Sequence, residues 1–143
     1  MYLLLWALVS ALIVLLDFVT KRIVSGSMKL YESIPVIKNV FNITYVKNTG
    51  ASFGMMSGAR WFFVVVTVIL ICAVIFYTVK NKIHDKLFLL SASFVIGGGI
   101  GNLIDRVATG EVVDFFDFCL IDFAIFNVAD CFISISFIML VIL

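Results

Sequence analysis

The sequence is poor in charged residues, in proline and in histidine. Charged side chains make up 13% of its 143 residues, hydrophobic ones make up 64%, and the mean hydropathy is +1.23. A soluble domain carries about 25% charged residues, so this deficit indicates an integral membrane protein. The 10 lysines and arginines form no basic block, and nucleic-acid binding is therefore not expected.

The chain has too few histidines and cysteines for several common kinds of catalytic and metal site. The single histidine, His84, lies in a polar turn. The three cysteines, Cys72, Cys119 and Cys131, form neither a CxxC pair nor a metal-ligand spacing. A Ser-His-Asp site, a Cys-His site and a histidine-rich zinc site are therefore not expected. We expect no metal and no other cofactor.

Four apolar runs approach the roughly 20 residues that cross a bilayer as a helix. We expect helices over about 3–24, 61–79, 87–104 and 123–143. They use most of the chain, which favours a single integral-membrane domain over residues 1–143. The alternation in 40–46 predicts a strand. The predicted fold class is thus an all-α membrane protein with four transmembrane helices and a small β-containing segment outside the membrane.

Two glycines predict close packing between helices. Gly97 and Gly101 form a small-xxx-small face that permits close helix contact.

The first apolar run has no basic start and no small-residue cleavage site, so we expect a retained anchor rather than a cleaved signal peptide. Three lysines in 80–86 favour the cytoplasm for that turn. More basic residues lie on the opposite side, so charge alone leaves the orientation open.

Acidic residues gather where two apolar runs meet water. The segment 105–122 carries five acids against one base. Two acids are of most interest, Asp114 after two β-branched residues and Asp130, expected about two turns into the fourth helix. An ionisable group in a spanning segment costs roughly 2.5–3.5 kcal/mol, so it is a functional candidate by default. Asp17 and Lys21, four residues apart, are expected to pair on one helix face.

Paired carboxylates offer one definite chemistry. Two acids held close together share a proton, so one can deprotonate a water molecule while the other polarises a scissile carbonyl group. A proton or ion relay and purely structural pairing remain alternative interpretations of the same acids. The clustering of the acids toward one face disfavours a relay, which would distribute them across the bilayer.

Five short blocks carry a family resemblance. In chain order they are Asp17-x-x-Thr20-Lys21, 48–54 (NTGASFG), 101–106 (GNLIDR), 112–115 (VVDF) and 126–130 (FNVAD). In order and spacing they resemble the blocks of bacterial lipoprotein signal peptidase, also called signal peptidase II. The resemblance extends from Asp17 to Asp130.

The resemblance implies an aspartic endopeptidase of the bacterial inner membrane, with both termini in the cytoplasm and the active site on the extracytoplasmic face. It would cleave prolipoproteins just before a diacylglyceryl-modified cysteine, with membrane lipid around it, and act as a monomer. The family's catalytic pair, which activates water, matches Asp114 and Asp130. Its supporting and substrate-facing positions match Asn48, Gly50, Asn102, Asp105, Arg106 and Asn127. Asp105 is expected to pair with Arg106, and Asp17 with Lys21 is expected to be structural.

Overall fold

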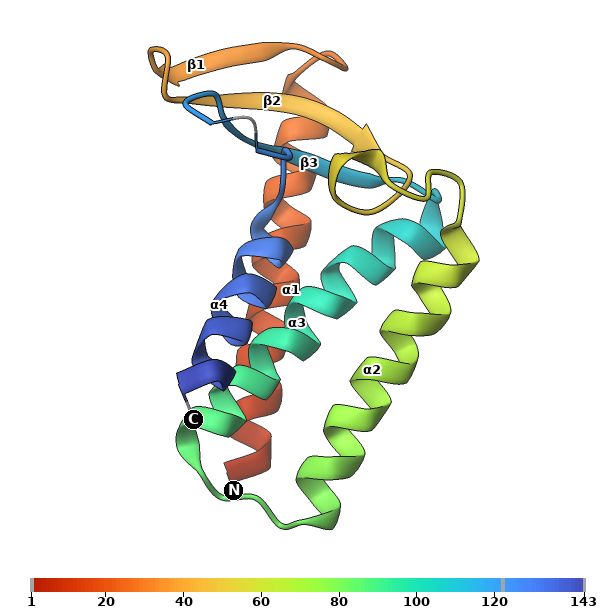
Figure 1. The fold of residues 1–143 in the computed structure, drawn as a ribbon, viewed down its shortest axis with the longest axis vertical. Coiled ribbons are helices and arrows are strands. Elements are labelled where there is room, and N and C mark those ends of the chain that lie inside the picture. Colours follow the sequence, from red (N-terminus) through yellow and green to blue (C-terminus); the bar gives the residue numbers. More distant parts are fainter. Residues whose placement is uncertain (1, 122, 143) are drawn as a thin grey trace.

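The described residues form four α-helices beneath a small sheet. The computed structural model describes residues 2–121 and 123–142. Within them lie α1 (Tyr2–Ser27), α2 (Arg60–Lys80), α3 (Lys86–Ala108) and α4 (Val128–Ile142), with the strands β1 (Ser33–Ile37), β2 (Phe41–Asn48) and β3 (Val112–Phe118). The sheet covers one end of the helices, and the start of α1 and the end of α4 lie away from it (Figure 1). The predicted fold class is confirmed.

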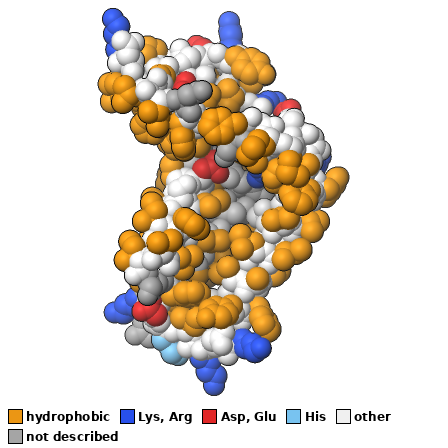
Figure 2. Space-filling model, viewed as in Figure 1, with side chains coloured by type: hydrophobic (Ala, Val, Ile, Leu, Met, Phe, Trp, Pro, Cys, Tyr) orange, Lys and Arg blue, Asp and Glu red, His pale blue; other side chains and the backbone are white. Residues whose placement is uncertain are grey.

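Three of the helices are long and apolar enough to cross a membrane. These spans are Leu3–Ser27, Arg60–Lys80 and Lys86–Ala108, while α4 is a shorter apolar helix of 15 residues. Hydrophobic side chains cover much of the outer surface along the helices (Figure 2). Such a surface is stable in lipid and would aggregate in water, so the protein is a multi-pass membrane protein.

Glycines let α3 pack closely against its neighbours. A Cβ atom at Gly97 would lie 2.8 Å from the Cβ of Ile13 on α1, and one at Gly98 would lie 2.6 Å from the carbonyl oxygen of Ala129 on α4. Any larger residue would separate these helices. The helix α2 packs against α3 (Figure 1), so α3 is the central helix of the bundle.

The sheet has the antiparallel order β1-β2-β3 and rests on helix ends. The predicted strand at 40–46 is confirmed within β2, whereas β1 and β3 were not predicted as strands. A buried cluster joins the four elements α1, β2, β3 and α4 through Val24, Tyr45, Phe115 and Val128. This cluster fixes the sheet over the ends of α1 and α4, which places β3 beside the start of α4.

The predicted start of the fourth helix at 123 is wrong. The backbone of Phe126 instead exchanges hydrogen bonds with Phe116 of β3, at 2.8 and 3.1 Å. The chain therefore stays extended until Asn127, and α4 begins at Val128. Asp130 consequently lies in the first turn of α4, not about two turns into it. The other helices differ from their predicted bounds by one to four residues at the ends.

Candidate active site

The start of α4 positions the first acid. The side-chain oxygen of Asn127 accepts a hydrogen bond from the backbone N–H of Asp130 at 3.0 Å. In return, Oδ2 of Asp130 accepts the backbone N–H of Asn127 at 3.2 Å. This reciprocal pair is a capping box, which satisfies two otherwise unpaired donors of the helix start. The local need for a helix cap thus directs the Asp130 carboxylate back toward the sheet.

Strand β3 positions the second acid against the same asparagine. Asp114 lies opposite Val46 in the sheet and is 2% exposed. Its Oδ1 accepts a hydrogen bond from Nδ2 of Asn127 at 2.6 Å, and its Oδ2 accepts one from Nδ2 of Asn48 at 3.0 Å. Asn127 therefore touches both acids, and the structure brings Asp114 and Asp130 together.

A third asparagine connects Asp130 to a buried lysine. Nδ2 of Asn102 donates to Oδ1 of Asp130 at 2.8 Å. The amide oxygen of Asn102 accepts from Nζ of Lys21 at 2.9 Å and from Nδ2 of Asn127 at 3.0 Å. These contacts fix the orientation of the Asn102 amide, because only its nitrogen can face the carboxylate.

Lys21 is the centre of a buried ionic group, which we call the Lys21 cluster (Lys21, Asp17, Asp105 and Asn102). Nζ of Lys21 lies 2.7 Å from Oδ2 of Asp17 and 3.0 Å from Oδ2 of Asp105. With Asn102 these contacts use all three ammonium donors. Lys21 is 3% exposed and Asp17 is 1% exposed, so the charges are compensated inside the protein.

The expected pair of Asp17 and Lys21 is present, whereas the expected pair of Asp105 and Arg106 is not. Asp105 pairs with Lys21 and also accepts the backbone N–H of Val113 at 3.3 Å. Asp17 also contacts the start of α4, because its Oδ1 accepts a hydrogen bond from the backbone N–H of Ala129 at 2.9 Å. The Lys21 cluster thereby holds both the start of β3 and the start of α4.

Arg106 lies over the loop that follows β2. Its Nη2 donates to the carbonyl oxygen of Gly50 at 3.1 Å, and its guanidinium carbon lies 5.0 Å from the centre of the Phe63 ring. The backbone N–H of Gly50 donates to Oδ1 of Asn48 at 2.9 Å. A Cβ atom at Gly50 would collide with the carbonyl oxygen of Met55, so only glycine permits this loop conformation.

These groups line a cavity of about 860 Å³. Asn48, Gly50, Asn102, Arg106, Asp114 and Asp130 form its polar end. Its wall is apolar, from residues Phe63, Phe118, Ile121, Phe123, Ile125, Phe126, Ile133 and Ile135 among others. Figure 2 shows acidic atoms in a hollow beneath the sheet, surrounded by hydrophobic side chains. The cavity combines a buried acid pair with a surface suited to hydrocarbon.

Burial changes the protonation of Asp114. Loss of solvation, and after it the neighbouring charge of Asp130, raise the pKa of its carboxyl group to about 7. The hydrogen bonds from Asn48 and Asn127 oppose this shift by stabilising the charged form. A carboxyl group with a pKa near neutrality can hold a proton and release it during a reaction.

Two features of the site were not predicted from the sequence. One is the contact between Arg106 and Phe63, and the other is the link from Lys21 through Asn102 to Asp130. The partners in each lie in separate helices far apart in the chain, so no local pattern indicates them. Among residues 2–121 and 123–142, no three His, Cys, Asp or Glu side chains are grouped so that they could hold a metal ion.

Comparison with known proteins gives consistent matches over nearly the whole chain. The family model described as Signal peptidase (SPase) II matches residues 9–143. A lipoprotein signal peptidase of Brevibacillus brevis is 43% identical over 129 residues, which cover 90% of this chain and 87% of the relative. One of Halothermothrix orenii is 44% identical over 123 residues, covering 86% and 83%.

A solved structure agrees with the sequence relatives. It is described as a bacterial membrane enzyme structure determined by the in meso method at 2.3 Å resolution. It has a TM-score of 0.91 and 38% sequence identity, and the match covers 96% of this chain and 85% of that chain. The fold, the spans and the sequence relatives agree, and the chain belongs to the signal peptidase II family.

Proposed function

We propose that this protein is a lipoprotein signal peptidase of the aspartic type, which hydrolyses prolipoproteins just before a diacylglyceryl-modified cysteine. The observation that carries the proposal is the convergence of Asp114 and Asp130 at the polar end of an apolar cavity. Family membership supports the peptidase activity. The acid pair supports the aspartic mechanism, because the cavity brings together two carboxyl groups in unequal environments.

The two acids take different roles in this proposal. Asp114 is buried, and its pKa of about 7 lets it carry the shared proton. Asp130 lies in the first turn of α4 and accepts hydrogen bonds from Asn102 and from the backbone of Asn127. Those donors and the positive end of the helix stabilise a negative charge there. Asp130 is therefore the base, and Asp114 is the acid.

The reaction then follows in two balanced steps. Asp130 takes a proton from a water molecule, whose oxygen forms a bond to the scissile carbonyl carbon. The carbonyl oxygen receives the π electron pair and the proton of Asp114, and a neutral gem-diol results. In the second step the C–N bond breaks, the leaving nitrogen takes the proton from Asp130, and one diol hydroxyl returns its proton to Asp114.

Several polar residues support this chemistry without exchanging protons. Asn102 and Asn127 hold the two carboxyl groups, and the Lys21 cluster holds Asn102 from behind. Arg106 lines the cavity and is held by the Gly50 carbonyl, so it can bind a polar group of the substrate. Asp17 and Asp105 act structurally, since they neutralise Lys21 and bind backbone N–H groups. This mechanism uses no metal or other cofactor.

The apolar wall suits a lipid-bearing substrate. Phe118, Ile121, residues 123–126 and side chains of α4 form one side of the cavity. The acyl chains of a diacylglyceryl cysteine would lie against this wall, while the peptide bond lies at the polar end. Each buried CH₂ group contributes roughly 0.8 kcal/mol, so a substrate without acyl chains loses much of its affinity. All of the site groups come from one chain, which supports action as a monomer.

We place the site on the extracytoplasmic face of the bacterial inner membrane and both termini in the cytoplasm. Cys119 is exposed at the sheet end of the molecule and directly follows β3, so it can report the side. A variant with Cys119 as its only cysteine is treated in intact cells with a membrane-impermeant maleimide. Labelling supports the placement, whereas labelling only after the cells are opened contradicts it.

Cleavage of a purified prolipoprotein tests the activity itself. The substrate is supplied with and without its diacylglyceryl group, to wild type and to the variants Asp114→Asn and Asp130→Asn. Asp117→Asn is the matched control, because Asp117 lies on the same strand but bonds to Thr44 rather than to the acid pair. Wild type and the control should cleave the lipidated substrate, and the two dyad variants should not.

Either of two outcomes would overturn the proposal. Cleavage by both dyad variants at the wild-type rate would remove the carboxyl groups from the mechanism. Loss of wild-type activity in a chelator, with recovery on adding a divalent cation, would show metal-dependent hydrolysis. Circular dichroism of each variant shows whether lost activity reflects lost folding.

A further inference from the structure

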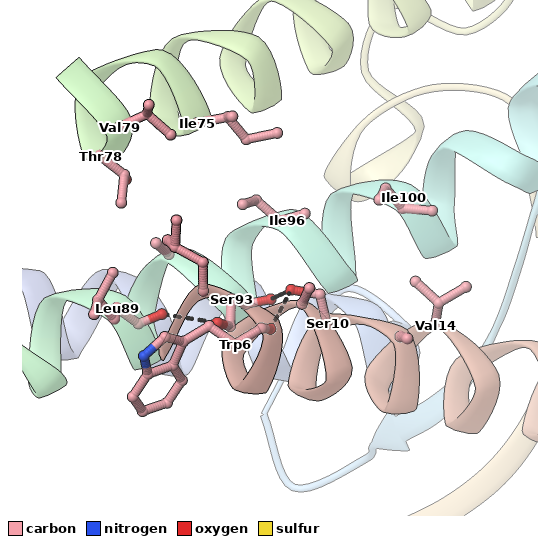
Figure 3. Close-up of a pocket in the computed structure, with 14 residues that line it drawn as sticks. Trp6, Ser10, Val14, Ile75, Thr78, Val79, Leu89, Ser93, Ile96 and Ile100 are labelled. Atoms are coloured by element: carbon pink, nitrogen blue, oxygen red, sulfur yellow. Dashed lines mark hydrogen bonds between the residues drawn. The ribbon is translucent and has the colours of Figure 1, made fainter. Parts of the chain in front are cut away.

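A second cavity lies in the half of the bundle away from the sheet. Its volume is about 590 Å³, and it lies between α1, α2 and α3. In Figure 3 the labelled α2 residues Ile75, Thr78 and Val79 lie across the cavity from Trp6 and Ser10 of α1. No charged side chain is among its described lining residues. None of those residues lines the candidate active site, so the cavity is separate from it.

The cavity has the chemistry and the length of a lipid-tail site. Its α3 lining extends from Leu89 to Ile100, which at a rise of 1.5 Å per residue is roughly 16 Å. Half of a ~30 Å hydrocarbon core is about the same depth. The hydroxyl groups of Ser10, Thr78 and Ser93 bond to backbone carbonyl groups, so they offer an acyl chain an apolar surface.

Basic residues lie in the turn and at the helix start next to the cavity. Lys82 lies in the turn two residues after the end of α2, which lines the cavity with Thr78 and Val79. Lys86 is the first residue of α3 and precedes the lining residue Leu89 by three, so these two share a helix face. Neither lysine forms an ion pair with a described residue. Figure 2 shows basic side chains at this end of the molecule.

The other charged groups of the turn point to the same conclusion. The Nζ of Lys80 lies 5.3 Å from the Phe76 ring centre, directed along α2. Asp85 caps α3 by accepting the N–H of Phe88 at 2.7 Å, so its charge is matched to the helix start. Lys82 and Lys86 therefore remain free to bind an anion.

We propose that this cavity binds a phospholipid with an anionic headgroup, with one acyl chain between α1, α2 and α3 and the phosphate beside Lys82 and Lys86. A basic site at the membrane surface beside an apolar groove between helices favours such a lipid. Trp6 lines the cavity, and its buried indole N–H has no acceptor within the described part of the chain. A lipid ester carbonyl near the headgroup would supply that acceptor.

Tryptophan fluorescence provides a direct test. The chain has two tryptophans, so Trp61→Phe leaves Trp6 as the only one, in the wall of the cavity. The protein is reconstituted into vesicles of equal parts phosphatidylglycerol and phosphatidylcholine. Bromine atoms, which quench tryptophan, are placed on the chains of one lipid or the other. Surface charge is then identical in the two samples, and only the identity of the neighbouring lipid differs.

We expect the cavity to bind phosphatidylglycerol roughly tenfold more tightly than phosphatidylcholine. Brominated phosphatidylglycerol should therefore quench Trp6 more strongly than brominated phosphatidylcholine does. Lys82→Gln with Lys86→Gln should remove the preference. Lys29→Gln with Lys38→Gln, which changes the net charge equally at the sheet end, should preserve it. Cleavage activity should stay unchanged in both double variants, because these lysines do not line the active-site cavity.

Three results would overturn the proposal. Equal quenching by both lipids would mean that bulk lipid fills the cavity without selection. Loss of the preference in the control variant would assign it to net charge. If quenching falls as the protein-to-lipid ratio rises, a second copy of this chain displaces lipid from the cavity.

Discussion

Replacing Asp114 by asparagine should abolish cleavage and at the same time stabilise the folded protein at alkaline pH. In the folded state the pKa of Asp114 is about 7, against an ordinary value of 3.8. The folded protein therefore binds this proton more tightly than the unfolded chain does. Stability from this group is fully present below the ordinary pKa and is lost as the pH rises through 7.

The size of the effect follows from the shift. Each pKa unit corresponds to roughly 1.36 kcal/mol, so the change from 3.8 to about 7 costs the folded state up to about 4 kcal/mol at pH 8. Asp114→Asn removes this cost and keeps an oxygen that can accept from Asn127 or Asn48. The variant should therefore exceed wild type in stability at pH 8, and the difference should shrink as the pH is lowered toward 4.

Thermal unfolding of detergent-solubilised protein measures this difference at each pH. Wild type should unfold at lower temperature at pH 8 than at pH 5, and Asp114→Asn should show a smaller change. Asp117→Asn, on the same strand, should show no gain at pH 8. If Asp114→Asn instead lowers the unfolding temperature equally at both pH values, its hydrogen bonds outweigh its burial, and the proposed role as proton carrier fails.

Three further changes probe the elements that hold the acid pair. Lys21→Met should lower the free energy of unfolding by roughly 3–5 kcal/mol, because it leaves buried carboxylates unpaired. Lys47→Met, which breaks the exposed pair with Glu111, should cost only roughly 0–1 kcal/mol, and equal losses in denaturant titration would contradict this expectation. Gly101→Ala should lower the free energy of unfolding by about 1–3 kcal/mol and slow cleavage, because its methyl group would lie 2.6 Å from Oδ2 of Asp17. An unchanged unfolding midpoint would contradict this and show that Asp17 can move. Asn127→Ala should lower the free energy of unfolding by about 1 kcal/mol, because a helix cap is lost, and it should also abolish cleavage, since both acids bond to Asn127. Activity near that of wild type would refute the positioning role of Asn127.

The helices could be predicted because their signal is local. A run of apolar residues near 20 in length has few structural solutions other than a membrane-spanning helix. The close contact predicted for Gly97 and Gly101 is also present, since both face α1. The start of α4 was misjudged because Phe123–Phe126 is as apolar as the helix that follows. Only pairing with β3, a tertiary contact, keeps this segment extended.

The sequence blocks indicated residues that lie close together in the fold, but not which of them contact each other. Asn48, Asn102, Asp114 and Asp130 line one cavity, and Asn127 bonds to both acids. Asp105 pairs with Lys21 rather than with its neighbour Arg106, since residues adjacent on a helix do not face each other. Contacts such as Lys21 with Asn102 join residues 81 positions apart, and no periodicity in a single chain encodes such a distance.

The same hydrogen bonds that build the fold also define the acid pair. Asn127 ends the extended segment, caps α4 and donates to Asp114, so the local start of a helix sets the relative position of both carboxyl groups. Asp17 binds a backbone N–H of the same helix start while it neutralises Lys21. A site formed from caps and strand ends is rigid, because displacing either acid would break secondary structure. That rigidity keeps two carboxyl groups close despite their repulsion, and burial together with the neighbouring Asp130 raises the pKa of Asp114.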